Sequence, residues 1–256
     1  MTTGALREVN IFKHLRKACL CGTLVLLCAC TPPQEPAAQT ETDRSAAPPA
    51  NPYTDAPLPP VFSADDWRLR LVNRWTPLPD EFTVDAVEVD GGYRFDSRAA
   101  DALHAMLTDC RAAGLHPQIC SAYRTRDYQT ALFEKQCIKQ QREYGLEGEA
   151  AVQAAGTVVA VPGTSEHELG LAVDICSASY PFLDEAQERT PEYQWLLANC
   201  AGYGFILRYP PGTTDQTGII YEPWHFRYVG KEAAAYIMER GWTLETFHER
   251  IISKTP

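Results

Sequence analysis

Hydrophobic side chains recur at the spacing of an α-helix in the stretch that follows Asp96 and Ser97. The repeating positions are Leu103, Met106, Leu107 and Cys110. Either Asp96 or Ser97 can accept the hydrogen bonds that cap a first helical turn, and Gly114 suits the C-terminal end. The pattern therefore predicts one amphipathic helix that ends beside Gly114.

Short apolar runs and longer polar stretches alternate along the chain from there to Arg240. Four runs read as strands, at residues 118–123, 171–176, 205–209 and 225–229. Four other stretches have helical character, at residues 126–144, 147–158, 190–202 and 231–240. The third of these opens on Thr190-Pro191-Glu192, a strong helix start, and Gly202 is its predicted stop. Helices interspersed with separated strands favour an α+β fold.

The first thirty residues have the layout of an export signal. Four basic residues lie within residues 7–17, and residues 18–27 form an apolar run without charge. This run is about half of the roughly 20 residues that span a bilayer, which is typical of a signal peptide. It ends in Leu27-Cys28-Ala29-Cys30, which resembles the lipobox of bacterial lipoproteins. We therefore expect a signal peptide at residues 1–29 and a diacylglycerol on Cys30; the alternative is a cysteine-rich core helix.

Proline dominates the segment that follows the expected lipidation site. Residues 31–60 hold nine of the 19 prolines of the chain. Such a segment cannot bury a core and has an extended, semi-stiff character. We interpret residues 30–60 as a lipidated cysteine and a tether, and residues 61–256 as one folded domain. The expected location is extracytoplasmic, with the protein anchored by its lipid to the bacterial cell membrane.

The charge of the chain excludes one class of partner. The formal net charge is −10, and the residues up to position 29 contribute +3, so the remainder carries −13. A body this acidic lacks the basic surface that binds a nucleic-acid backbone. We expect no nucleic-acid binding.

Five cysteines follow Cys30. An exported protein can keep disulfides, although the sequence alone does not fix their pairing. We expect bridges between neighbouring elements, which would join Cys110 to Cys120 and Cys176 to Cys200 and leave Cys137 free. No Cys-x-x-Cys motif occurs, which argues against a thiolate zinc site.

A histidine and an aspartate stand seven residues apart at the start of the second predicted strand. Asp174 lies within the apolar sequence Ala-Val-Asp-Ile, where a buried carboxylate costs several kcal/mol unless a cation or a metal compensates it. An odd separation would place His167 and Asp174 on opposite faces of a regular strand. Gly170 between them offers a bend that could bring the two side chains together.

A second polar cluster, Glu222-Pro223-Trp224-His225, opens the last predicted strand. Two histidines and one aspartate, here His167, Asp174 and His225, form a three-ligand set typical of catalytic zinc, which leaves a position for water. Glu222 could hold its carboxylate near that water without being a ligand, and could act as its proton acceptor.

Three better-known catalytic patterns are excluded. Residues 163–167 lack the last glycine of the Gly-x-Ser-x-Gly elbow of serine hydrolases. The run from His167 to Leu171 fails the His-Glu-x-x-His pattern at its last position. No serine begins a Ser-x-x-Lys motif, so serine penicillin-binding chemistry is excluded as well.

Three motifs occur in a fixed order along this domain. They are Ser-Ala-Tyr-Arg-Thr at residues 121–125, Ser-x-His-x-x-Gly-x-Ala-x-Asp at residues 165–174 and Glu-Pro-Trp-His at residues 222–225. Together they resemble the signature of the VanY-like D-alanyl-D-alanine carboxypeptidases, which are M15 zinc peptidases. The resemblance covers roughly residues 67–240 and implies an α+β fold, with a small antiparallel sheet flanked by helices and a zinc site in a cleft on the sheet.

The same resemblance implies the roles of the site residues. One zinc ion per chain would be held by His167, Asp174 and His225, with Glu222 as general base and then general acid. Arg124 is the cation expected to bind the free C-terminal carboxylate and to support the oxyanion, because a guanidinium binds carboxylates bidentately. Substrate-binding positions expected beside it are Gln129, Ser165, Tyr209 and Trp224.

The implied reaction is the removal of the C-terminal D-Ala from peptidoglycan stem pentapeptides. An L,D-carboxypeptidase on tetrapeptide stems is the first alternative, because relatives with these motifs do either. A D,D-dipeptidase is less favoured, since the tether suits a wall-facing substrate. A peptide-binding lipoprotein without catalysis is the third alternative, although neither a ligand nor the base is missing. The expected partners are stem peptides and, through the lipid, the membrane; the expected state is a monomer.

Overall fold

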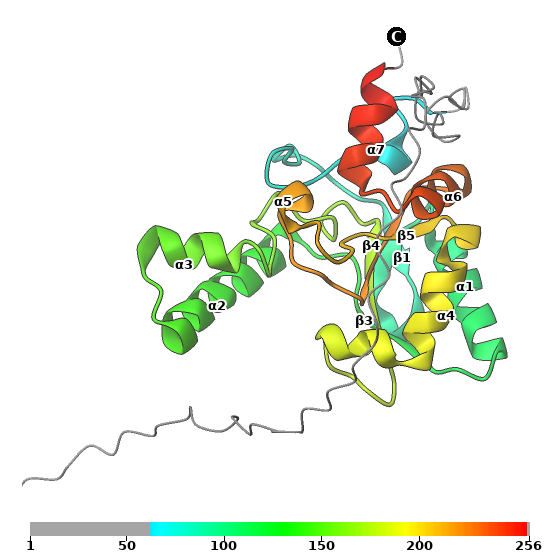
Figure 1. Ribbon diagram of the computed structural model, residues 1–256, viewed down its shortest axis with the longest axis horizontal. Coiled ribbons are helices and arrows are strands. Elements are labelled where there is room, and N and C mark those ends of the chain that lie inside the picture. The colour runs from blue at the N-terminus through cyan, green and yellow to red at the C-terminus, as the bar shows by residue number, and fades with distance from the viewer. Residues whose placement is uncertain (1–61, 255–256) are drawn as a thin grey trace, which may run out of the picture. The chain divides into compact units, whose positions relative to one another are not determined.

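The computed structural model describes residues 62–254 (Figure 1). The predicted signal peptide, the lipidation at Cys30 and the tether lie outside the described residues. Within residues 62–254, no helix combines the length and the apolar character that crossing a membrane would need.

A four-stranded antiparallel sheet, in the order β3–β4–β6–β5, carries the site. Its strands are β3 (Pro117–Ser121), β4 (Ala172–Ser177), β6 (His225–Tyr228) and β5 (Phe205–Leu207). Every residue of the inner strand β4 is buried, which explains why its sequence is apolar apart from Asp174 and Ser177. A separate two-stranded sheet pairs β1 (Ala86–Glu88) with β2 (Arg94–Asp96).

Seven α-helices complete the described part of the chain. They are α1 (Ala100–Ala112), α2 (Arg126–Tyr144), α3 (Gly148–Ala155), α4 (Pro191–Asn199), α5 (Thr214–Thr217), α6 (Lys231–Arg240) and α7 (Leu244–Arg250). Figure 1 shows α1, α4 and α6 together on one side of the sheet, whereas α2 and α3 project as a pair on the other side. The predicted α+β class, with a small antiparallel sheet flanked by helices, is confirmed.

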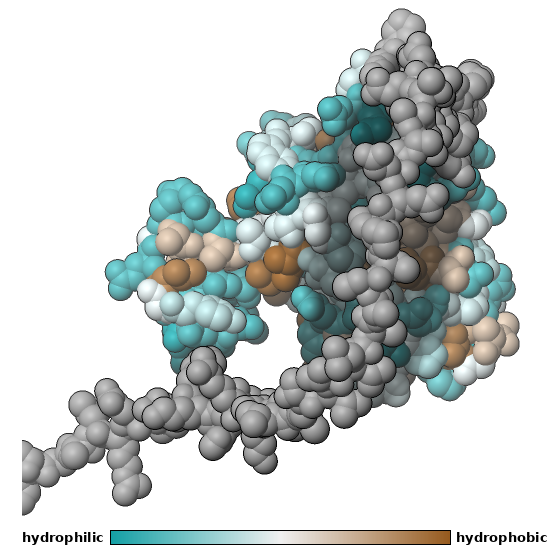
Figure 2. All heavy atoms as spheres, in the orientation of Figure 1, coloured by the Kyte–Doolittle hydropathy of each residue, from teal (hydrophilic) through white to brown (hydrophobic). Residues whose placement is uncertain are grey.

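Two hydrophobic clusters hold these layers together. The larger one packs the sheet against α1 and α4, and Phe95, Leu103 and Phe226 in it are fully buried. The smaller one packs α6 and α7 against β5 and contains Ile237 and Phe247. On the face shown in Figure 2, hydrophobic surface gathers where the α2–α3 pair meets the rest of the described chain.

Every helix and strand predicted from the sequence has a counterpart, and the differences concern how helices begin and end. Helix α1 begins at Ala100, and neither Asp96 nor Ser97 caps it. The Asp96 carboxylate instead accepts hydrogen bonds from Arg98, so the predicted N-cap is wrong. Gly114 follows α1 with a positive φ of 81°, as its predicted place at the helix end requires.

The predicted stop of α4 at Gly202 is also wrong. The helix ends at Asn199, and a 3-10 turn, Cys200–Tyr203, follows it. The left-handed residue that closes this turn is Gly204, with a φ of 89°. A Cβ at Gly204 would lie 2.8 Å from the Tyr228 ring and 3.1 Å from the Gly230 backbone, so close packing selects glycine at this position.

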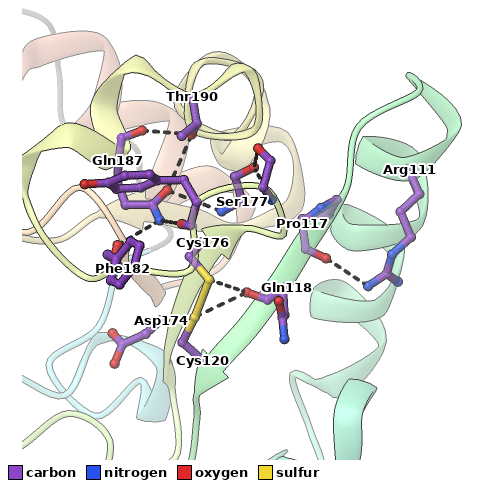
Figure 3. The surroundings of a disulfide bond; sticks show 12 residues. Arg111, Pro117, Gln118, Cys120, Asp174, Cys176, Ser177, Phe182, Gln187 and Thr190 are labelled. Carbon is purple, nitrogen blue, oxygen red and sulfur yellow. Dashed lines mark hydrogen bonds between the residues drawn. A yellow bond between two sulfur atoms is a disulfide. The ribbon is translucent and has the colours of Figure 1, made fainter.

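The predicted disulfides are wrong, because strand pairing rather than nearness in sequence decides which cysteines meet. Cys120 in β3 is bonded to Cys176 in β4, 56 residues further along the chain. Cys110 and Cys200 are buried and free, and Cys137 is free as predicted. Figure 3 shows Asp174 beside the bridge. The bridge therefore joins the two strands next to the predicted metal ligand.

The bend predicted at Gly170 is present. This glycine has a φ of 79°, and a Cβ there would lie 2.7 Å from Cγ1 of Val84. We expect Gly170→Ala to lower the free energy of unfolding by about 2–4 kcal/mol, through left-handed backbone strain and overpacking. Gly114→Ala is the matched control, because its φ is 81° and its Cβ would meet open space. Equal thermal midpoints for the two variants would contradict the packing argument.

Candidate active site

The sheet register brings two of the predicted ligands side by side. Asp174 in β4 is paired with His225 at the start of β6. His167 lies in the turn before β4, and this turn is closed by a hydrogen bond from the Gly170 N–H to the His167 carbonyl. Because Gly170 reverses the chain there, the His167 ring returns to the face of the sheet that carries Asp174.

The Asp174 carboxylate lies between the two imidazoles. His167 Nε2 is 3.2 Å from Asp174 Oδ2, and His225 Nδ1 is 3.0 Å from Asp174 Oδ1. One donor atom from each of the three residues lies within 4.8 Å of the others, and all three side chains are buried. Two imidazoles and a carboxylate in this arrangement fit zinc, since they supply three ligands and leave a position open.

A second contact fixes the tautomer of His167. Its Nδ1 is 2.7 Å from the carbonyl oxygen of Ala122, which can only accept. The proton therefore sits on Nδ1, and the lone pair of Nε2 points at Asp174. A backbone carbonyl that orients an imidazole in this way is a common feature of zinc sites.

The surroundings shift the pKa values of His167, Asp174 and His225. Burial lowers the pKa of His167 to about 4, so its imidazole is neutral. Burial also opposes charge on Asp174, but the hydrogen bond to His225 and the charge of Arg124 hold the pKa of this carboxyl well below its usual range. For His225, burial is outweighed by the carboxylates of Asp174 and Glu166, which raise its pKa to about 9.

Glu222 stands beside this set without belonging to it. Its Oε2 is 3.6 Å from His225 Nδ1, and the side chain is buried. Burial raises the pKa of Glu222 to about 8 even though the charge of His225 opposes it. A carboxyl group with a pKa near neutrality can both take up and return a proton, and a divalent cation beside it would favour the ionised form.

Arg124 reaches the site from the segment between β3 and α2. Its Nε donates to Ser121 Oγ at 2.8 Å, its Nη1 to Gln129 Oε1 at 3.2 Å and its Nη2 to Asp174 Oδ2 at 2.8 Å. These bonds use three of the five N–H donors of a guanidinium. Gln129 is fully buried, and its Nε2 donates to the Ala160 carbonyl at 2.7 Å. The structure thus places Gln129 behind Arg124.

A cavity of about 250 Å³ opens over these groups. The predicted residues in its wall are Arg124, Ser165, His167, Asp174, Tyr209, Glu222, Trp224 and His225, whereas Gln129 is not in the wall. The Tyr209 ring packs 4.7 Å from the His225 ring, measured between centroids. Ser165 accepts a hydrogen bond from the His167 N–H, so its hydroxyl also helps to hold the turn.

Sequence reasoning missed the apolar part of this wall. It consists of Leu132, Val158, Val159, Leu183 and Ile219, together with Ala160. Leu132 comes from α2, and both valines, Val158 and Val159, follow α3 directly. The projecting α2–α3 pair therefore supplies one side of the cavity. Such residues are ordinary in a sequence, and only tertiary packing brings them to the site.

An antiparallel sheet with a buried His–Asp–His set, a separate glutamate and an arginine in one cavity is the arrangement expected of a zinc peptidase. A family model described as "VanY: D-alanyl-D-alanine carboxypeptidase" matches residues 92–231. The chain belongs to this family, as the motifs predicted. A D-alanyl-D-alanine carboxypeptidase of Enterococcus faecalis is 41% identical over 186 residues, which is 71% of this chain and 66% of the relative. The chain thus matches slightly less than two thirds of that relative's length.

Solved structures agree on the fold. VanYB in complex with D-alanine-D-alanine has a TM-score of 0.66 and 39% identity, and the match covers 73% of this chain and 99% of that one. The VanY D,D-pentapeptidase of a VanB-type resistance cassette, solved with Zn(II), has a TM-score of 0.64 and 40% identity over 71% of this chain and 99% of that one. The prediction of zinc is confirmed by this relative and by the donor set.

One further structural relative has a different specificity. The LD-carboxypeptidase LdcB has a TM-score of 0.62 and 36% identity, and the match covers 71% of this chain and 85% of that one.

Proposed function

We propose that this protein is a zinc-dependent D,D-carboxypeptidase that removes the C-terminal D-Ala from peptidoglycan stem pentapeptides. The observation that carries the proposal is the cavity in which Arg124, Glu222 and the His–Asp–His set face one another. An exopeptidase needs a cation for the free carboxylate next to its hydrolytic centre, and Arg124 lies one hydrogen bond from Asp174. VanYB, which has the same fold, binds D-alanine-D-alanine.

Each of the side chains that face the cavity has a distinct role in the proposed reaction. His167, Asp174 and His225 would hold one zinc ion, which would lower the pKa of a water molecule to about 7 and polarise a carbonyl group. Glu222 takes the proton of the attacking water on its carboxylate and gives it to the departing amine. Arg124 binds the C-terminal carboxylate of the substrate through its remaining N–H donors, and Gln129 keeps its guanidinium in place.

Mass spectrometry of muramyl pentapeptide, incubated with the zinc-loaded full chain in detergent, tests this proposal. Loss of one alanine, prevented by a chelator, is the expected result. An intact pentapeptide would contradict D,D-carboxypeptidase activity.

L,D-carboxypeptidase activity on tetrapeptide stems is the second candidate, and the similarity to LdcB favours it. The same experiment separates the two candidates. Release of alanine from a tetrapeptide that ends in D-Ala, with the pentapeptide intact, would replace the first proposal by this one.

Arg124 gives a test of how the substrate end is recognised. We expect Arg124→Ala to lower kcat/KM about 10- to 100-fold for peptides with a free C-terminal carboxylate, the loss typical of a charged hydrogen bond. For peptides with an amidated C-terminus, kcat/KM should fall much less. Arg142→Ala, at an exposed arginine of α2, is the control. An unchanged preference for the free acid in Arg124→Ala would remove this role.

We also propose that the protein acts outside the cytoplasm as a lipid-anchored monomer. The basic, apolar and Cys30 segments of residues 7–30 support the anchor, and the proline-rich tether supports a substrate in the wall. In a host that lipidates proteins, the wild-type chain should sediment with membranes and Cys30→Ala should not. Equal sedimentation of both would contradict the lipid anchor, and a dimer in analytical ultracentrifugation would contradict the monomer.

A further inference from the structure

Glu166 is a buried carboxylate with one oxygen held and the other free. Its Oε1 accepts hydrogen bonds from Arg208 Nε at 2.7 Å and from Arg227 Nη1 at 2.6 Å. Both arginine side chains are fully buried. The second oxygen, Oε2, is buried and has no hydrogen-bond partner among residues 62–254. Such an atom costs free energy unless it is satisfied in another state of the protein.

A buried nitrogen that also lacks a hydrogen-bond partner faces Glu166 Oε2. His225 Nε2 is buried, forms no hydrogen bond with the described residues and lies 3.6 Å from Glu166 Oε2. The opposite edge of the ring carries Nδ1, which lies 3.0 Å from Asp174 Oδ1 and 3.6 Å from Glu222 Oε2. The imidazole therefore presents Nδ1 to the metal ligands and Nε2 to Glu166.

In His167, too, one ring nitrogen faces the metal ligands and the other faces an oxygen acceptor, but Nδ1 and Nε2 have exchanged these roles. His167 presents Nε2 to Asp174 and binds the Ala122 carbonyl through Nδ1. Each imidazole thus turns one nitrogen to the metal and the other to an oxygen acceptor. For His167 that acceptor is a neutral carbonyl, and for His225 it is a carboxylate.

We propose that Glu166 is a positioning residue for the zinc site, whose Oε2 accepts the Nε2–H of His225 when His225 binds zinc through Nδ1. The hydrogen bond fixes the tautomer and the orientation of the ring and raises the basicity of Nδ1. It also satisfies the two buried polar atoms that otherwise lack partners.

Glu166 can do this because its own position is fixed. Arg208, which holds its Oε1, donates from Nη1 and Nη2 to Glu245 of α7, at 2.8 and 2.6 Å. Two guanidiniums and two carboxylates therefore balance in one cluster, in which only Glu245 is partly exposed, and Glu245 also accepts a hydrogen bond from Asn73. A carboxylate bound by two immobile guanidiniums is preorganised, which a ligand-orienting group requires.

The zinc affinity of two matched variants tests the proposal. Glu166→Gln and Glu245→Gln each remove one carboxylate charge from the same cluster, but only the first faces His225. We expect Glu166→Gln to weaken zinc binding about 10- to 100-fold in a chelator competition at constant pH, the usual cost of losing an outer-shell partner. Glu245→Gln should bind zinc like the wild type. Equal losses in both variants, or no loss in Glu166→Gln, would overturn the proposal.

A measurement on the unaltered chain covers the case in which Glu166→Gln fails to fold. In the zinc-loaded ¹⁵N-labelled protein, two-bond ¹⁵N–¹H spectra identify which ring nitrogen of His225 carries the proton, and His225→Ala assigns the signal. The Nε2–H form, slow to exchange with solvent, is expected; the Nδ1–H form would refute the proposal. The inference rests on the proposed function only for the presence of zinc, and neither readout uses a substrate. Failure to cleave stem peptides would therefore leave it standing.

Discussion

Replacing Glu222 by glutamine is expected to reduce kcat by about 10²- to 10⁴-fold while the zinc stays bound. The carboxylate is buried beside His225 but stands outside the His–Asp–His set. An amide of the same shape keeps the packing of the cavity and cannot take the proton of the attacking water. KM should change little, because Arg124 rather than Glu222 binds the free end of the substrate.

Steady-state kinetics and metal analysis of the same preparation check this expectation. Asp96→Asn, the same kind of change at a buried carboxylate outside the cavity, is the control and should retain most of the activity. Loss of zinc from Glu222→Gln would mean that the glutamate is a ligand, and full activity would mean that another group is the base.

Replacing Asp174 by asparagine is expected to abolish zinc retention. The loss of affinity should exceed the roughly 10- to 100-fold cost of an outer-shell change, because the anionic ligand between the two imidazoles is lost. Arg124 also donates to Asp174, so its guanidinium loses a charged partner in the same variant. Activity on peptides with a free carboxylate should therefore stay low even with excess zinc.

The zinc content after dialysis measures the first of these effects. Asp96→Asn is the matched control, because Asp96 is also a buried carboxylate paired with an arginine, Arg98, but lies outside the cavity. If Asp174→Asn kept as much zinc after dialysis as Asp96→Asn, Asp174 would not be a ligand.

Local patterns in the sequence were sufficient to predict most of the helices and strands and the centre of the site. Periodicity predicted α1 because its buried positions repeat along one helix face. The odd spacing of His167 and Asp174 was resolved correctly by Gly170, whose backbone conformation is a local property. The predicted cap of α1 failed because the Asp96 carboxylate binds Arg98, only two residues further along the chain, whereas Thr190 caps α4 as predicted. Elements β1, β2, α5 and α7 had no predicted counterpart.

Features that depend on strand order could not be predicted. Cys120 and Cys176 meet because β3 pairs with β4, and no local pattern contains that pairing. Glu166 occupies a variable position of the histidine motif, and its importance follows from Arg208 and Arg227, which lie about 40 and 60 residues further on. Gln129 was expected to help bind the substrate end, but it lies outside the cavity wall, where its amide binds both Arg124 and the Ala160 carbonyl.

The attachment of α7 to the buried arginine cluster limits how far the chain can be shortened from its C-terminus. A truncation before Leu244 would deprive Arg208 of Glu245, one of its two carboxylate partners, and would uncover Ile237 of the smaller core. Arg208 and Arg227 would then share one carboxylate, Glu166, and a buried guanidinium without a counter-charge of its own costs several kcal/mol. The expressed protein should therefore retain α7 and the buried Ile251 and Ile252 that follow it, and an affinity tag at the C-terminus should follow a spacer rather than replace this helix.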